Sequence, residues 1–130
     1  MLPKGSLASK RNEAEHLEQV AFMAWCDLQR RKYPELELFF AIANGGHRSV
    51  ATAGKLKAEG VKAGIPDLHL PVSRGAYHSL FIEMKAGKNR TSAAQDAMIA
   101  KLQQAGNYCA VCYGAQEAIA VTLDYLEGRL

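Results

Sequence analysis

Apolar residues recur every three or four positions over residues 12–33, a spacing that predicts an amphipathic α-helix. Pro34 ends this helix because a proline has no amide hydrogen to continue the hydrogen-bond ladder. A second side of the helix carries Glu15 and Gln19, one turn apart and near Phe22, and we expect this side to be partly buried as well. The apolar stripe expected to pack on the core consists of Leu17, Val20, Ala21, Ala24 and Leu28.

Other stretches of the chain show either short apolar runs, which predict strands, or helical periodicity behind a capping residue. Residues 35–43 alternate between polar and apolar and then become continuously apolar, which is typical of a strand that enters the core. Ser92 and Gln95 have the spacing of a capping box and predict the start of a helix. Strands are predicted over 35–43, 65–72, 80–86 and 108–113, and the further helices over 49–59, 92–105 and 115–127.

This order of elements predicts an α/β fold with a mixed four-stranded sheet flanked by helices. The segment from strand 80–86 through helix 92–105 to strand 108–113 should form a right-handed parallel crossover. The core order is α-β-β-β-α-β, with a short extra helix at 49–59 and a C-terminal helix. Residues 1–10 contain little to bury and read as a flexible tail, so we expect a single domain over residues 11–130.

Composition places the chain among globular proteins and excludes several classes. Its 130 residues are enough for one core, with 48% hydrophobic and 22% charged residues and a net charge of only +3. No apolar run is long enough to span a membrane and no secretory signal is visible, so a cytoplasmic location is expected.

The cysteine count is three, and an odd count without a secretory signal argues against a disulfide scaffold. Cys109 and Cys112 form a CxxC that lies within a predicted strand, with no second pair at zinc-site spacing. We interpret them as buried structural residues, and a redox or zinc site remains the alternative.

Ionisable residues interrupt two apolar strands in the centre of the chain. Asp67 follows Pro66, and Glu83 and Lys85 are two residues apart, so both point to one face of a strand. Two carboxylates that meet on neighbouring strands would form an oxygen site suited to Mg²⁺ or Mn²⁺, and the lysine would orient a water or neutralise charge on a phosphate. The alternative is a buried salt bridge between Lys85 and one of the acids, which would be a poor source of stability.

The most basic stretch of the chain, residues 47–62, precedes these strands. It contains Arg48, Lys55, Lys57 and Lys62 against the single acid Glu59. The stretch is either a surface that contacts phosphates or an ordinary solvated surface, and its composition alone leaves both open.

The central residues resemble a known nuclease motif. Pro66-Asp67, a loop, and then Glu83-Met84-Lys85 is similar to the PD-(D/E)xK motif of restriction-endonuclease-like nucleases. The surroundings narrow the likeness, because residues 43–48, 57–67, 81–85 and 92–95 resemble the VRR-Nuc (virus-type replication-repair nuclease) family. The similarity extends over residues 13–127 and implies a restriction-endonuclease-like core.

The resemblance implies a metal-dependent endonuclease that hydrolyses DNA phosphodiester bonds and leaves a 5′-phosphate. Stand-alone members of this family are phage or bacterial proteins that act on branched DNA, including four-way (Holliday) junctions in DNA repair, as homodimers. Two alternatives are a module that binds branched DNA without cutting it and a sequence-specific restriction-type nuclease with the same site.

The resemblance also implies roles for individual residues. Asp67 and Glu83 match the metal ligands, helped by the backbone carbonyl of Met84, and Lys85 matches the catalytic lysine. Glu15 matches the acid of the family's first helix, which lies four residues before a glutamine, and Glu18 is the alternative candidate for this acid. Gln95 matches a glutamine near the metal site, although a role as the capping-box partner explains it equally well. The residues expected to contact phosphates are Arg48, Lys55, Lys57, Lys62, Lys88 and Arg90.

Overall fold

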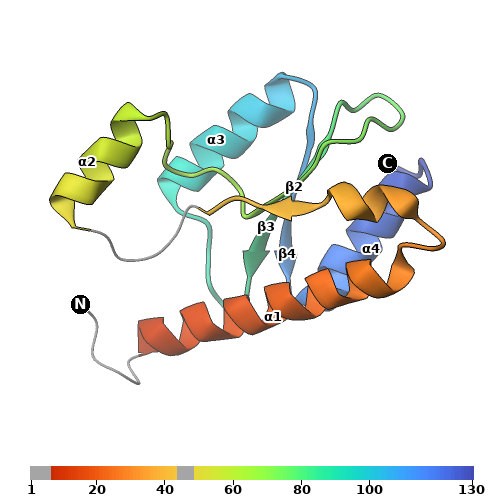
Figure 1. Cartoon of the computed structure of the whole chain (residues 1–130), viewed down its shortest axis with the longest axis horizontal. Coiled ribbons are helices and arrows are strands. Elements are labelled where there is room, and N and C mark those ends of the chain that lie inside the picture. Colours follow the sequence, from red (N-terminus) through yellow and green to blue (C-terminus); the bar gives the residue numbers. More distant parts are fainter. Residues whose placement is uncertain (1–6, 44–48) are drawn as a thin grey trace.

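A four-stranded sheet with helices on both faces forms the centre of the molecule (Figure 1). The computed structural model describes residues 7–43 and 49–130. The strands lie in the order β1-β2-β3-β4; the first two pairings are antiparallel and β3 runs parallel to β4. The predicted mixed sheet and the parallel passage through the central helix are confirmed. The strands are β1 (Phe40–Ala41), β2 (Leu68–Leu70), β3 (Leu80–Lys85) and β4 (Tyr108–Tyr113).

The helices form a layer on each side of the sheet (Figure 1). The helices α1 (Leu7–Gln29) and α4 (Ala115–Leu126) pack against each other on one face, and α3 (Ala93–Gln104) lies on the other. The short helix α2 (Val50–Ala58) has no buried residue and stands away from the sheet. No helix in the described part of the chain is long and apolar enough to cross a membrane.

Alternation along β3 assigns its two faces. Leu80, Ile82 and Met84 are almost fully buried and belong to the core between the sheet and helices α1 and α4. Phe22 of α1 and Tyr125 of α4 fill that core from the helix side. Because side chains alternate along a strand, Phe81, Glu83 and Lys85 project from the opposite face, toward α3. The chemistry-bearing residues of β3 are therefore separated from the main core by the sheet itself.

The predicted strand over 35–43 is wrong for its first half. Residues Pro34–Leu38 form a 3₁₀ helix, η1, and only Phe40–Ala41 pair with the sheet. Proline supplies a helical φ angle at the first position, and Leu36 and Phe39 are both buried at the three-residue spacing of a 3₁₀ turn. The predicted strand over 65–72 shortens to three residues, since the prolines on either side of it cannot donate to a ladder.

The predicted orientation of the first helix is also wrong. The apolar stripe expected in the core is exposed, with Leu17 at 60% and Leu28 at 80% of full exposure. The side that packs is the one with Phe22 and Cys26, because an aromatic ring buries far more apolar area than an alanine. The helix also begins at Leu7 rather than at residue 12, so residues 7–10, assigned to the tail, are helical. It ends at Gln29, four residues before the predicted end, whereas α2, α3 and α4 lie within two residues of their predicted bounds.

Candidate nuclease site

Two carboxylates meet on the face of the sheet that carries Glu83. The register pairs Leu68 with Ile82, and its continuation by one residue places Asp67 opposite Glu83. The Asp67 carboxylate accepts a hydrogen bond of 2.8 Å from the backbone N–H of Met84, and its backbone carbonyl accepts one of 2.8 Å from Ile42. Asp67 is therefore fixed from both sides, although it lies just outside the strand.

A glycine brings the Asp67 loop close to the start of α3. Gly64 has φ +81°, and a Cβ atom on it would lie 2.3 Å from the carbonyl oxygen of Ala94. This position therefore requires glycine for two reasons: its backbone is left-handed, and there is no room for a Cβ atom. No local pattern in the sequence indicates this close approach.

Glu83 is held in an environment that disfavours its charge. Its side chain is only 2% exposed, and its Oε1 atom has no hydrogen-bond partner among the described residues. Burial first, then the negative charge of Asp67 and a hydrogen bond from protonated Glu83 to the Asp67 carboxylate, raise the pKa of Glu83 to about 9; Glu15 adds a smaller effect and Lys85 opposes it. A buried acid with a free oxygen beside a second acid is a site where a cation would relieve electrostatic repulsion.

Lys85 shares this face and does not form the salt bridge that was the alternative interpretation. Only 8% of Lys85 is exposed. In the described part of the chain, however, no carboxylate oxygen lies within 4.0 Å of its ammonium nitrogen, the distance that defines an ion pair. The ion pairs found there join Arg74 to Glu35 and Arg129 to Asp124, both away from the site. A buried lysine that is not neutralised by an adjacent acid remains available to a substrate.

The two acids of α1 have different surroundings. The carboxylate of Glu15 accepts a 2.5 Å hydrogen bond from the side-chain amide of Asn89, in the loop after β3, and its charge acts on Glu83. Glu18 instead accepts a 2.7 Å hydrogen bond from the backbone N–H of Ala115, at the start of α4. The structure therefore brings Glu15 toward the carboxylate pair, whereas Glu18 caps a helix.

Asn89 is a site residue that the sequence did not suggest. Besides its bond to Glu15, its backbone carbonyl accepts a 2.7 Å hydrogen bond from the hydroxyl of Tyr113. The loop that joins β3 to α3 is thus tied both to α1 and to β4. An asparagine between two basic residues carries no sequence signal of such a contact.

Gln95 both caps a helix and contacts Glu83. Its backbone N–H and side-chain oxygen form a full capping box with Ser92 at the start of α3. Its side-chain nitrogen also lies 3.3 Å from Oε2 of Glu83 and donates to it. The cap therefore orients the amide so that it reaches the buried acid.

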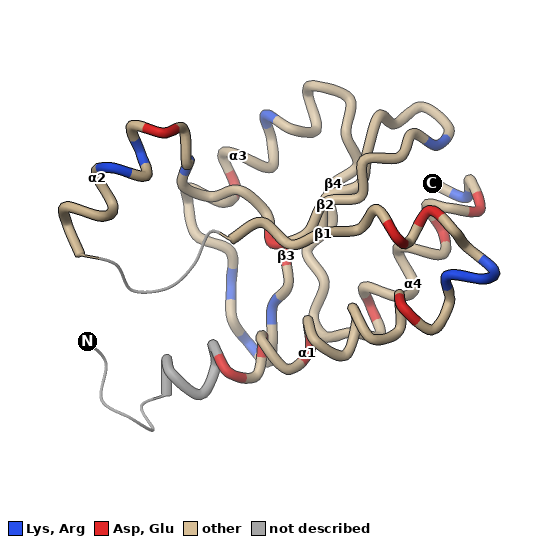
Figure 2. The backbone as a smooth tube through the Cα atoms, viewed as in Figure 1, with Lys and Arg blue, Asp and Glu red and all other residues tan. Residues whose placement is uncertain are grey.

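Basic residues gather on and after α2 and in the loop between β3 and α3, and those that the structure describes there form no ion pair. Blue segments in Figure 2 mark α2 and the loop between β3 and α3. Arg48 lies outside the described residues. The exposed basic residues among those expected to contact phosphates are Lys55, Lys57, Lys62, Lys88 and Arg90.

The cysteines take no part in the site. Cys109 pairs in register with Phe81 and Cys112 with Met84, so the two side chains point to opposite faces of the sheet. Burial raises the pKa of Cys109 to about 11 and of Cys112 to about 12, so both remain thiols at neutral pH. In the described ranges no three His, Cys, Asp or Glu side chains are grouped closely enough to hold a metal.

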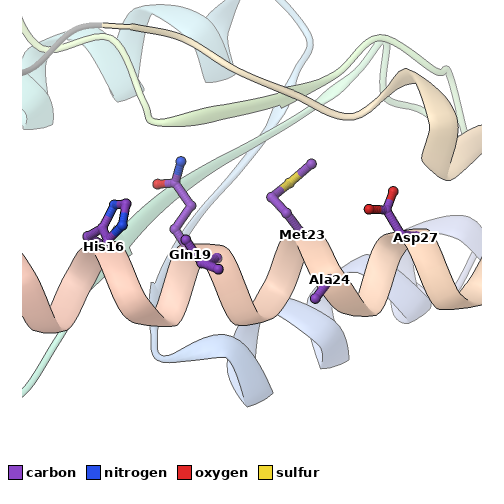
Figure 3. A pocket seen from close by; sticks show the side chains of 6 residues that line it. His16, Gln19, Met23, Ala24 and Asp27 are labelled. Carbon is purple, nitrogen blue, oxygen red and sulfur yellow. The ribbon is translucent and has the colours of Figure 1, made fainter.

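The hollow drawn in Figure 3 lies along α1. It has a volume of about 350 Å³, and none of its lining residues is a predicted catalytic residue. His16, Gln19 and Met23 project from α1 toward the sheet. Among the described residues, the side-chain hydrogen bond to Glu83 comes from Gln95 and not from Gln19. The lining residues are His16, Gln19, Val20, Met23, Ala24 and Asp27.

A mixed α/β sheet with an aspartate beside a Glu-x-Lys strand is the arrangement of the PD-(D/E)xK class of nuclease domains. The chain matches the model of the VRR-NUC domain over residues 7–116, and it belongs to this family of nuclease-type domains. It is also similar to a solved structure described as a VRR_NUC domain protein, with 34% sequence identity, a TM-score of 0.73 and coverage of 88% of this chain and 89% of that one. A search among curated proteins gave no match.

Proposed function

We propose that the protein is a metal-dependent DNA endonuclease that hydrolyses phosphodiester bonds in branched DNA, such as four-way junctions, and leaves a 5′-phosphate. The observation that carries this proposal is the convergence of Asp67 and Glu83 on one sheet face beside a buried Lys85 that has no acidic partner in the described structure. A purely structural site would place the lysine against an acid. We infer that the enzyme works in the cytoplasm of a bacterial cell, on chromosomal or phage DNA.

The donor set fits a hard divalent cation. Both carboxylates offer oxygen atoms, and the buried Oε1 of Glu83 has no other partner among the described residues. Mg²⁺ prefers such oxygens and keeps several of its waters, so two or three protein ligands are enough. Asp67, Glu83 and the backbone carbonyl of Met84 would hold Mg²⁺ or Mn²⁺, with Glu15 reaching it through a water. When bound, the cation would lower the pKa of a water and neutralise charge on the phosphate.

The side chains of the site divide the remaining work. The ammonium group of Lys85 orients the attacking water and stabilises the negative charge that develops on the phosphate. Gln95 holds one oxygen of Glu83, which leaves the other free for the cation. Asn89 holds Glu15 in place from the neighbouring loop. The basic residues on α2 and after β3 neutralise flanking phosphates, so DNA binding weakens as the salt concentration rises.

A cleavage assay tests this function. The substrates are a four-way junction, a flap, a linear duplex and a single strand, each with Mg²⁺ or Mn²⁺ at low salt. We expect nicks in the junction that disappear in Lys85→Ala and persist in the control Lys101→Ala, an exposed lysine of α3. Fixed cuts in linear duplex would indicate a sequence-specific enzyme, and tight junction binding without any cutting would refute catalysis.

We also propose that two copies associate through the exposed stripe of α1, which we call the α1 stripe: Leu17, Ala21, Ala24 and Leu28. These residues alternate at spacings of four and three, as in the seam of paired helices. Leu17 and Ala21 of the stripe line a hollow of about 410 Å³, so a second helix could fit its side chains there. The small side chains of Ala21 and Ala24, at the centre of the stripe, would allow the two helices to approach each other closely.

Charge favours an antiparallel arrangement of the two helices. Three of the four acids of α1, Glu13, Glu15 and Glu18, lie in its first half, and the turn that follows the helix is basic (Figure 2). Lys10 and Arg11 at the start of the helix and Asp27 in its last turn depart from this pattern. With the two-fold axis between Ala21 and Ala24, Leu17 faces the Leu28 of the other copy, and Glu13 faces Lys32. A parallel pair would instead bring like charges together, which is destabilising.

Light scattering of the purified protein tests this association. We expect a dimer mass for the wild type and a monomer mass for Ala24→Glu, which introduces a charge on an exposed surface without disturbing the core. Leu38→Glu is the control, because Leu38 is 52% exposed but lies outside the α1 stripe. A monomeric wild type at micromolar concentration would contradict the proposal.

A further inference from the structure

A row of three aromatic rings crosses the sheet beside the carboxylate pair. Phe40, His69 and Phe81 occupy one register line across β1, β2 and β3. The His69 ring stacks on Phe81 with centroids 4.1 Å apart and planes 13° apart, and Phe40 contacts His69 edge-on at 5.4 Å. His69 and Phe81 each lie two residues from Asp67 or Glu83, so the row shares their sheet face at a distance of about 7 Å along the strands.

The row is closed at one end and open at the other. Phe81 is buried beside α3, His69 is half-buried, and Phe40 is 46% exposed on the edge strand β1. The inner rings therefore fix the row in place, while the outer ring presents part of its surface to solvent. Exposed aromatic surface next to a site that binds DNA is typical of stacking platforms for bases.

We propose that Phe40 forms a stacking subsite for an unpaired nucleobase of the DNA strand that is cut. This inference rests on the proposed nuclease function and adds a source of substrate selectivity to it. A base inside a duplex is already covered by its neighbours, whereas a base at a branch point or in a flap can stack on a side chain. Every base has a flat π surface, so such a subsite selects for unpaired DNA without reading its sequence. The selectivity for branches would then need no separate base-reading module.

Binding measurements in the Lys85→Ala background test the subsite with intact DNA. The probes are a branched DNA with unpaired nucleotides at the branch and a linear duplex of the same length. We expect Phe40→Ala to weaken binding of the branched DNA roughly tenfold and binding of the duplex less than about twofold. Phe40→Trp should bind like the parent, and Phe40→Leu should resemble Phe40→Ala. Leu38→Ala, which removes an exposed apolar side chain nearby in the sequence, is the control.

A fluorescent base analogue, 2-aminopurine, at the unpaired position gives a second readout. Its emission should fall on binding to the parent protein and remain unchanged on binding to Phe40→Ala, because stacking quenches it. Equal weakening of both DNAs by Phe40→Ala, or parent-like binding by Phe40→Leu, would overturn the subsite and leave the nuclease proposal intact. Failure of the parent to bind either DNA would overturn both.

Discussion

Replacement of Glu83 by glutamine should make the metal-free protein more stable while it abolishes cleavage. The pKa of Glu83 lies near 9 in the folded protein against an ordinary value of 4.5, because burial and the charge of Asp67 disfavour ionisation. The folded state therefore binds more protons than the unfolded state between these two values, and the free energy of unfolding falls as the pH rises. Glutamine has nearly the same shape as glutamate and no charge. The free energy of unfolding of the variant should therefore not fall as the pH rises through this range.

The expected size follows from linkage. Each pH unit between the two pKa values lowers the free energy of unfolding by about 1.4 kcal/mol if Glu83 alone titrates. From pH 5 to pH 7 the wild type should therefore lose roughly 2 to 3 kcal/mol, a large share of the stability of a small domain. The gain of Glu83→Gln over the wild type should be below about 1 kcal/mol at pH 5 and about 2 kcal/mol or more at pH 7.

Urea unfolding in EDTA at pH 5, 6, 7 and 8 measures this effect. The single tryptophan, Trp25, packs against the core and stacks on Phe22, with ring centroids 5.9 Å apart, so its fluorescence reports unfolding. Glu59→Gln, at an exposed position, is the control. Added Mg²⁺ should stabilise the wild type but not Glu83→Gln. A wild-type stability that stays flat or rises from pH 5 to pH 7, with no gain in the variant, would refute the electrostatic reasoning.

Three contacts outside the carboxylate pair give further predictions. Glu18→Ala removes the cap of α4 and should lower the free energy of unfolding by about 1 kcal/mol in urea melts, with unchanged cleavage at 25 °C. Asn89→Ala should lower the cleavage rate several-fold through a misplaced Glu15, while DNA affinity and stability stay close to those of the wild type. Gly64→Ala should cost roughly 2 kcal/mol more than Gly60→Ala, since both glycines have positive φ but only the first has a backbone atom in the way. An equal loss in the two alanine variants would contradict the close approach at Gly64.

The parts of the fold that the sequence predicted well have strong local signals. The capping box at Ser92 and the apolar run of β4 predict where these elements lie, and the structure confirms both. The parallel pairing of β3 with β4 follows from the helix between them. Local chemistry therefore predicted the C-terminal half almost completely.

The N-terminal half was predicted less well because tertiary packing decides it. Periodicity alone offers two apolar sides of α1, and the larger rings on the second side decide which one faces the sheet. The segment after Pro34 alternates like a strand, but its buried residues are three apart, which a 3₁₀ turn satisfies equally well. In both cases the hydrophobic pattern is present in the chain, but the sequence does not show which segment each element packs against.

For the candidate site, the sequence predicted which charged residues lie together but not what holds them. Asp67, Glu83 and Lys85 stand out as charges in apolar strands, and the sheet register places all three on one face. The supporting contacts from Asn89 and Gly64 depend on segments far apart in the chain, so no local spacing reveals them. The contact of Glu18 with the start of α4 likewise joins segments far apart in the chain.

The two acids of α1 explain how one helix can serve both structure and chemistry. Glu15 and Glu18 are three residues apart, so they project from nearby positions on the helix surface. Glu18 fastens the start of α4, whose preceding Gly114 has no side chain to cap it, and this contact fixes α1 against the sheet. With the helix fixed, Glu15 is carried to the edge of the carboxylate pair and held there by Asn89. Loss of Glu18 should therefore loosen the fold first, whereas loss of Glu15 should impair cleavage in a protein that is still stable.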